Sequence, residues 1–176
     1  NTIQFGDGTG AAAYAGYINY THSDDVLAFA TGGSEAMRID SSGNVGIGSV
    51  PDSWSGITSL DVAQSASFAG HDSQNAAYFM NNLYFNGSAW TAKNTGTSSG
   101  IVLDDITGHI AFYQNASASA DTSVSLVERM RISGGNLLVG KTSNTFSTSG
   151  FSANANGMSA TRSGGACVQI NRTSSD

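Results

Sequence analysis

The chain has 176 residues, of which only 11% are charged, and its formal net charge is −6. Glycine and serine fill 22 and 27 positions, whereas leucine, isoleucine, valine and phenylalanine together supply only 34. So few large apolar residues predict a chain that shares its core with copies of itself. The acidic balance and scattered basic residues exclude a nucleic-acid-binding face.

Residues 1–50 alternate between apolar and polar positions in short runs separated by turn residues. Ile18 and Tyr20 begin this pattern, and Val45 and Ile47 end it. A period of two over short runs is typical of half-buried strands. Gly43 closes the turn before the last run, where we expect a left-handed backbone conformation. We therefore predict a first β module over residues 1–50.

Residues 51–103 form a predicted β linker region. The Asn86-Gly87 pair lies between two short apolar runs and predicts a hairpin with a type I′ turn, because both central positions of that turn need positive φ. Residues 74–81 are the one place where the sequence allows a short helical turn. The period of two continues through this region at Leu60, Val62, Ala66 and Phe68.

Residues 104–142 form a second module that repeats the first at an offset of about 92 residues. The run Glu35-Ala36-Met37-Arg38-Ile39 returns as Glu128-Arg129-Met130-Arg131-Ile132. Each copy continues into a Gly/Ser turn, an asparagine and an apolar strand that ends in glycine. Residues 16–20 match residues 108–112 at a similar spacing. The two copies differ in length only between these matched segments, as expected for duplicated units.

Residues 143–176 are predicted to start a third β element, with Ala166, Val168 and Ile170 in alternation. We expect the chain to be a segment of a longer polypeptide, because Asn1 stands in place of an initiator methionine and no signal-like apolar run follows it. No apolar run is long enough to predict insertion into a membrane.

The run from Glu35 to Gly48 resembles the recurring motif of bacteriophage tail fibres, especially the repetitive fibres of marine and cyanobacterial phages. Residues 20–25, 84–90 and 169–176 carry supporting resemblances. The resemblance implies an all-β, elongated and repetitive fibre of short strands and hairpins, in which three identical chains intertwine around a common axis. It also implies a non-enzymatic function: a structural shaft segment of a virion tail fibre, located outside the cell and extended toward the host surface.

The partners expected from this resemblance are two further copies of the chain, other virion tail proteins and, at the tip, a host-surface glycan. Three copies could bury the apolar residues if each contributes one narrow face to a central column. The glycines of Gly46-Ile47-Gly48 would let chains approach closely while Ile47 points at the axis. Our candidates for the trimer core are Met37, Ile39, Val45, Ile47, Met130, Ile132 and Leu138.

The repeat retains one charged pair, Glu35 with Arg38, which returns as Glu128 with Arg131. Residues three apart on a regular strand face opposite sides, so no bond within the chain is expected. We therefore predict that each pair links neighbouring chains and sets their rotational register. The alternative is an exposed rim pair that contributes little.

We assign no catalytic, cofactor-binding or metal-binding residues. Adjacent aspartates such as Asp24-Asp25 face opposite sides of a strand and cannot act together within one chain, so we interpret them as solvated turn residues. His22, His71 and His109 are interpreted as surface or loop residues, with a metal held by three copies on a fibre axis as the alternative. The single cysteine excludes an intrachain disulfide.

Two other functions remain open on the sequence. The first is a glycan-binding adhesin or a receptor-binding fibre tip, in which Trp54, Tyr84 or Trp90 would stack on sugar rings. The second is a glycan-degrading tailspike, which the lack of a carboxylate pair with workable geometry disfavours.

Overall fold

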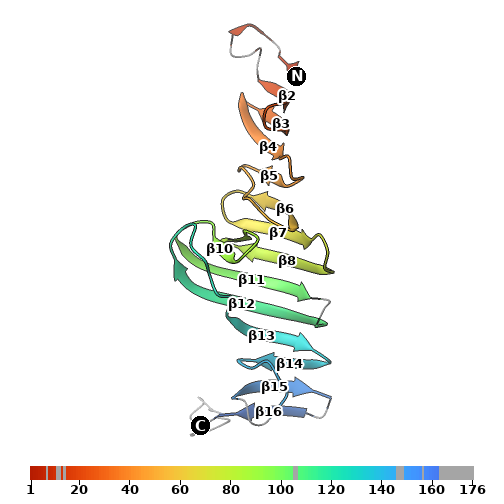
Figure 1. Ribbon diagram of the computed structural model, residues 1–176, viewed down its shortest axis with the longest axis vertical. Helices are drawn as coiled ribbons and strands as arrows, with labels where there is room; N and C mark the ends of the chain where they lie inside the picture. The colour runs from red at the N-terminus through yellow and green to blue at the C-terminus, as the bar shows by residue number, and fades with distance from the viewer. Residues whose placement is uncertain are drawn as a thin grey trace, which may run out of the picture.

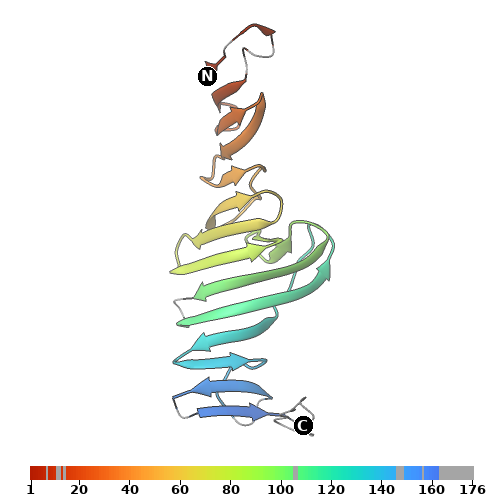
Figure 2. The same ribbon diagram turned by 180° about the vertical axis from the view of Figure 1, so that it is seen from behind.

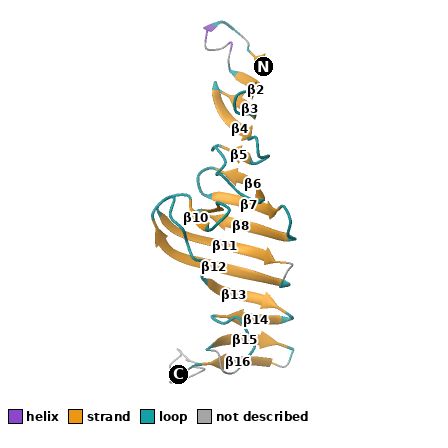
Figure 3. Ribbon diagram, in the orientation of Figure 1, coloured by secondary structure: helices purple, strands orange, loops and turns teal. Residues whose placement is uncertain are grey.

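The computed structural model describes residues 1–6, 8–10, 13, 15–104, 107–145, 149–155 and 157–162. These residues form strands and turns, and the only helical positions among them are the two 3₁₀ positions Gly10 and Ala13 (Figure 3). The prediction of an all-β fold is confirmed.

Fourteen strands form a single sheet and stack along the long axis of the molecule (Figures 1 and 2). Their order in the sheet is their order in the chain, so β1 and β16 lie at the two ends of the sheet that the described residues form. The strands are β1 (Thr2–Phe5), β2 (Gly16–Thr21), β3 (Val26–Thr31), β4 (Ser34–Ile39), β5 (Val45–Ile47), β6 (Ile57–Val62), β7 (Ala66–His71), β8 (Ala76–Asn81), β11 (Gly96–Asp104), β12 (His109–Ala118), β13 (Glu128–Ser133), β14 (Asn136–Val139), β15 (Gly150–Asn154) and β16 (Gly157–Thr161).

Neighbouring strands are antiparallel except β5 and β6, which are parallel. A parallel pair needs a connection that crosses over the sheet, and residues 48–56 make this crossover. Trp54 in the crossover packs against the sheet with Ile57 and Leu83.

A separate two-stranded hairpin, β9 (Leu83–Phe85) and β10 (Trp90–Ala92), lies in the chain between β8 and β11, which pair with each other in the sheet. Figure 1 shows it beside the wide middle of the molecule, where β11 and β12 are longest. The predicted hairpin is confirmed, but the type I′ turn is wrong. Gly87 has a φ of 96° and Asn86 is not among the positive-φ residues. The Asn86 side-chain oxygen instead accepts the N–H groups of Ser88 and Ala89, both at 2.9 Å.

The predicted helical turn at 74–81 is wrong, because β8 occupies Ala76–Asn81. Both faces of β8 carry apolar residues, so its sequence does not show the alternation of apolar and polar positions that indicates a strand. The expected turn at Gly43 is confirmed by a φ of 84°. The expected strand at 166–170 lies outside the described residues.

Strand pairing corrects the alignment of the two repeats. Phe29 lies opposite Met37 in the first module, and Phe112 lies opposite Met130 in the second. Residues 108–112 therefore take the place of residues 25–29 and not of residues 16–20. Asp25 and Gly108 begin these matching segments, and both have positive φ, at 53° and 64°. The second module differs by a longer connection, 119–127, between its first two strands.

Candidate functional site

The two sides of the sheet differ sharply in what covers them. The apolar cluster of the described residues lies on one side, which we call the covered face. Its strand residues include Ile57, Ala69, Tyr78 and Val102, and the β9–β10 hairpin packs on them through Leu83, which is fully buried. Val124 and Leu126 from the connection 119–127 pack on the same cluster. Three segments that leave the sheet, 48–56, 82–95 and 119–127, therefore fold onto one side.

The opposite side, which we call the open face, is apolar from β1 to β16. Residues directly opposed on paired strands lie on the same face, so the register connects this face across each pair of strands, the parallel pair included. One row along it consists of Ile3, Ile18, Phe29, Met37, Ile47, Val62, Ala66, Phe68, Phe79, Ile101, Phe112, Met130, Val139, Phe151 and Ala160.

The open face carries most of the exposed large apolar side chains. Of the twelve such residues found in the described part of the chain, ten lie on this face, and the other two, Val50 and Val127, lie in connections. Phe68 and Phe79 are 48% and 49% exposed, and their rings contact each other with centroids 4.8 Å apart. Scattered apolar residues are normal on a protein surface, but a continuous apolar band marks an interaction surface.

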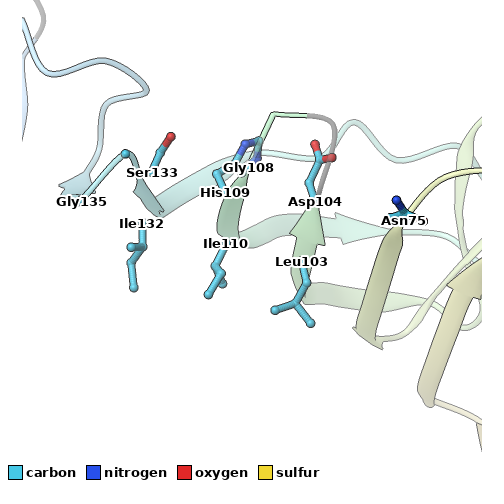
Figure 4. Close-up of a pocket in the computed structure, with 10 residues that line it drawn as sticks. Asn75, Leu103, Asp104, Gly108, His109, Ile110, Ile132, Ser133 and Gly135 are labelled. Carbon is cyan, nitrogen blue, oxygen red and sulfur yellow. The ribbon is translucent and has the colours of Figure 1, made fainter.

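Figure 4 shows side chains on both faces of the sheet around a pocket of about 430 Å³ near the turn between β13 and β14. Leu103, Ile110 and Ile132 point together to the open side, whereas Asp104 and Ser133 point to the other. Strand alternation produces this separation, because successive side chains project from opposite sides of a strand.

The predicted trimer-core residues divide between the two faces. Met37, Ile39, Val45, Ile47, Met130 and Ile132 all belong to the open face. Leu138 does not: it lies opposite Arg131, is 2% exposed and belongs to the covered face. Its repeat equivalent is Gly46, and its neighbours Leu137 and Val139 take the positions of Val45 and Ile47.

Several open-face residues were missing from the sequence prediction. They include Phe29, Phe68, Phe79, Ile101 and Phe112. The alternation through 60–68 already indicated one apolar side, and extending that period strand by strand would have found them.

The expectation that the repeated charged pairs have no bond within the chain is wrong. Arg38 donates to both Glu35 carboxylate oxygens, the second through Nη2 at 2.9 Å. A β-bulge explains the contact: Ala28 pairs with Arg38 while Ala30 pairs with Glu35, so Ala36 is the extra residue. The bulge brings Glu35 and Arg38 to the same face.

The second module repeats this arrangement with Arg129 as the extra residue, and Arg131 donates to Glu128 on the covered face. The pKa of Arg131, like that of Arg38, is raised, chiefly by the hydrogen bonds to its glutamate. Each pair thus has its partner within the chain and lies away from the open face.

At Gly46, where we expected chains to approach one another closely, the structure shows a close approach within the chain. A Cβ on Gly46 would lie 2.2 Å from the carbonyl oxygen of Ser49 and 2.9 Å from Pro51 Cδ. The crossover needs this glycine in order to pass over β5. Gly48 has a φ of 67°, which turns the chain into the crossover.

The histidines do not gather. His22 follows β2 and packs edge-on against Tyr20, and His71 Nδ1 accepts the N–H of Ser73. The interpretation of His109 as a surface or loop residue is wrong, because His109 lies in β12 on the covered face and is 9% exposed, beside Thr107, which donates to Asp104 at 2.9 Å. Among the described residues, no group of three His, Cys, Asp or Glu side chains could hold a metal ion.

The aromatic residues considered for sugar stacking mainly contact one another. Trp54 packs edge-on against Trp90 and Tyr84, with ring centroids 6.2 Å and 6.4 Å apart. Trp54 is 7% exposed, and Trp90 also contacts Tyr78. These rings hold the hairpin to the sheet.

Comparison of the chain with protein-family models, curated proteins and solved structures finds no match. In the described ranges, no helix has the length and apolar character needed to cross a membrane.

Proposed function

We propose that the chain is a structural segment of a homotrimeric fibre in which three copies lie side by side and bury their open faces in a common core. The observation that carries this proposal is the uncovered apolar face along the whole sheet. Exposed in water, such a face and its strand edges would favour aggregation. When the open faces of three chains pack against one another, each face is removed from water along its full length.

Another copy of the chain fits the open face better than an unrelated partner does. A partner must be as long as the sheet and apolar throughout, and a second copy has both properties. The width of the face favours three copies over two. Strands such as β4, β5 and β14 each place two large apolar side chains on it, giving a band only about 7 Å wide between their Cα atoms. Three narrow bands can close around one axis.

The viral part of the proposal depends on the resemblance of residues 35–48 to phage tail-fibre repeats. We assign the chain to the shaft of a virion tail fibre that reaches toward the host surface, with a non-enzymatic role. Modules that follow one another along one axis support this, because a shaft gains length by adding units that contact only their neighbours.

The oligomeric state of the purified chain tests the proposal. Light scattering after size exclusion should give three times the chain mass of 18.0 kDa, and small-angle X-ray scattering should show an elongated particle. A monomer or a dimer would contradict the trimer.

Substitution within the open face locates the interface. Val62→Asp introduces a charge on this face and should dissociate the trimer, because a carboxylate cannot be buried unpaired. Val50→Asp is the matched control, since Val50 is 65% exposed but lies in the crossover, and this variant should remain trimeric. Circular dichroism would verify that both variants keep their β-structure. Equal behaviour of the two variants would exclude the open face as the interface.

A further inference from the structure

One buried ionic cluster on the covered face takes no part in the proposed assembly. Lys93 directly follows β10, and its ammonium nitrogen lies 2.7 Å from Asp52 Oδ2 and 3.0 Å from Asp61 Oδ1. The side chains of Lys93 and Asp61 are 3% and 1% exposed, whereas that of Asp52 is 30% exposed. Asp61 belongs to β6 and Asp52 to the crossover, so three separate segments meet here.

Lys93 and Asp61 form a buried ion pair whose two contacting atoms make no aligned hydrogen bond. Within the described part of the chain, neither Lys93 Nζ nor Asp61 Oδ1 has a hydrogen-bond partner, although the two atoms are in contact. Buried polar groups are almost always hydrogen-bonded. The nitrogen therefore lies in contact with the carboxyl group to which it would have to add.

The other Asp61 oxygen is held by two N–H donors. Oδ2 accepts the backbone N–H of Asp52 at 2.9 Å and the indole N–H of Trp54 at 3.1 Å. Two fixed donors on one carboxyl oxygen polarise the carbonyl and stabilise the negative charge that develops when a nucleophile adds to it. The Trp54 ring, whose centroid is 5.6 Å from Lys93 Nζ, also limits access of water to the nitrogen.

We propose that Lys93 and Asp61 form an intramolecular amide bond, with Asp52 as the proton-transferring catalytic residue. A nucleophile, a polarised carboxyl group and an adjacent base are the groups that acyl transfer requires. All three are present here, with Lys93 Nζ in contact with both carboxyl groups. The overall reaction joins an ammonium and a carboxylate to give an amide and one molecule of water.

The protons balance within the cluster. Asp52 first carries one ammonium proton from Lys93 to Asp61 Oδ1, which leaves a neutral amine and a neutral carboxyl group. The nitrogen lone pair then adds to Asp61 Cγ, and the negative charge forms on Oδ2 between its two donors. Asp52 transfers a second proton from the nitrogen to Oδ1, the C–Oδ1 bond breaks, and water leaves. Asp52 ends as the carboxylate it was, and no oxidant or reductant is needed.

The bond would tie the hairpin segment to the sheet. It closes a covalent ring over residues 61–93, which includes β7, β8 and the β9–β10 hairpin. Cross-links stabilise folded proteins mainly by restricting the unfolded chain. In a fibre under tension, this link would keep the hairpin in place.

Intact mass spectrometry of the folded, full chain tests the proposal directly. The mass should be lower than the sequence mass by one water molecule. Trypsin should fail to cut after Lys93, because an acylated lysine is not recognised, so residues 39–129 should appear as one peptide. A folded chain with the full sequence mass would overturn the proposal and leave a simple ion pair.

Variants assign the roles. Lys93→Arg and Asp61→Ala should restore the full sequence mass, and Asp52→Asn should do so while keeping both reacting groups. Lys141→Arg is the matched control, because Lys141, the other lysine, is buried but donates to the Thr145 carbonyl. The Lys141→Arg variant should still have a mass one water molecule below its sequence mass. A full sequence mass in this variant would overturn the assignment of the bond to Lys93. The mass can be read in any oligomeric state, so failure here is distinguishable from failure of the fibre proposal.

Discussion

Single polar side chains hold the turns of the repeat in place. Asn44 is 2% exposed, and its side chain donates to Asp40 at 3.1 Å and accepts the N–H of Ser59 at 3.0 Å. It therefore connects the turn before β5 to β6. Asn136, its equivalent in the second module, donates instead to the carbonyl groups of Ser133 and Gly134. Its side-chain oxygen accepts from Asn144 Nδ2 at 3.1 Å. The asparagine thus connects its turn to β6 in the first module and to the connection after β14 in the second.

Replacement of Gly46 should be costly, because the backbone of the crossover lies against it. Gly46→Ala would press a methyl group against the backbone of Ser49, which cannot move without displacing the crossover. We expect a loss of about 1–3 kcal/mol in the free energy of unfolding, measured by chemical denaturation. Gly70→Ala is the control within one chain, since a Cβ there meets no atom of the chain within 4 Å; because Gly70 lies on the open face, both variants are compared in the Val62→Asp background, where Gly70→Ala should change stability by less than about 0.5 kcal/mol. Equal losses would show that the crossover can adjust.

Strand alternation decides on which face of the sheet each trimer-core candidate lies, and their burial in a trimer stays a prediction. Six of the seven core candidates lie on the open face because they follow the period of two. Leu138 lies on the covered face instead, and because it stands between two apolar residues, the sequence did not indicate on which face each of the three lies. The bond between Glu35 and Arg38 was missed because one bulged residue shifts the alternation, and a bulge has no clear sequence signal.

At the scale of elements, the connections on the covered face determine which side of the sheet stays open. Tyr78 and Tyr113 lie beneath these connections and belong to the core or pack against it. Burial, as the largest effect, raises the pKa of both hydroxyl groups above the ordinary value of 10.0. The folded chain therefore holds these protons more tightly than the unfolded chain does.

This difference predicts a loss of stability at alkaline pH. Below about pH 10 both tyrosines are neutral in the folded and in the unfolded chain, so they add no pH dependence to the free energy of unfolding. As the pH rises past 10, the unfolded chain ionises first and is favoured. Melting curves between about pH 8 and 11 should show a falling midpoint at the alkaline end. The double variant Tyr78→Phe/Tyr113→Phe should flatten this fall, and an unchanged slope would mean that other groups cause it.

The sequence predicted elements well where turns are marked and poorly where strands are apolar on both sides. The glycine-containing turns at 40–44 and 86–89 gave two correct hairpins. β8 was missed because Ala77 and Phe79 on the open face follow Ala76 and Tyr78 on the covered face. Its pattern became clear only once its neighbours β7 and β11 were known. The crossover and the parallel pair of β5 with β6 depend on long-range contacts that no local pattern records.

At the scale of the molecule, the chain has a core on one side of its sheet and an uncovered surface on the other. The low content of large apolar residues had already predicted a shared core, and the open face gives that expectation a location. The number of copies, their direction and their partners depend on contacts between molecules, which strand periodicity does not encode.

A shared core makes stability depend on concentration. If three chains fold together, the midpoint of thermal unfolding should rise with chain concentration, because association is linked to folding. We expect a clear rise over about a hundredfold range of concentration, measured by calorimetry under conditions of reversible unfolding. The Val62→Asp variant should show no such rise. A midpoint independent of concentration in the original chain would indicate that the sheet is stable alone.

The strand order described above also has a consequence for how the chain folds. Almost every strand pairs with the strand that precedes it in the chain, and the exception, β8 with β11, spans only the β9–β10 hairpin. Contacts between residues close in sequence form quickly, because little loop entropy is lost. Each new strand emerging during synthesis can add to the edge left by the last one. The sheet can therefore grow from its N-terminal end without waiting for the rest of the chain.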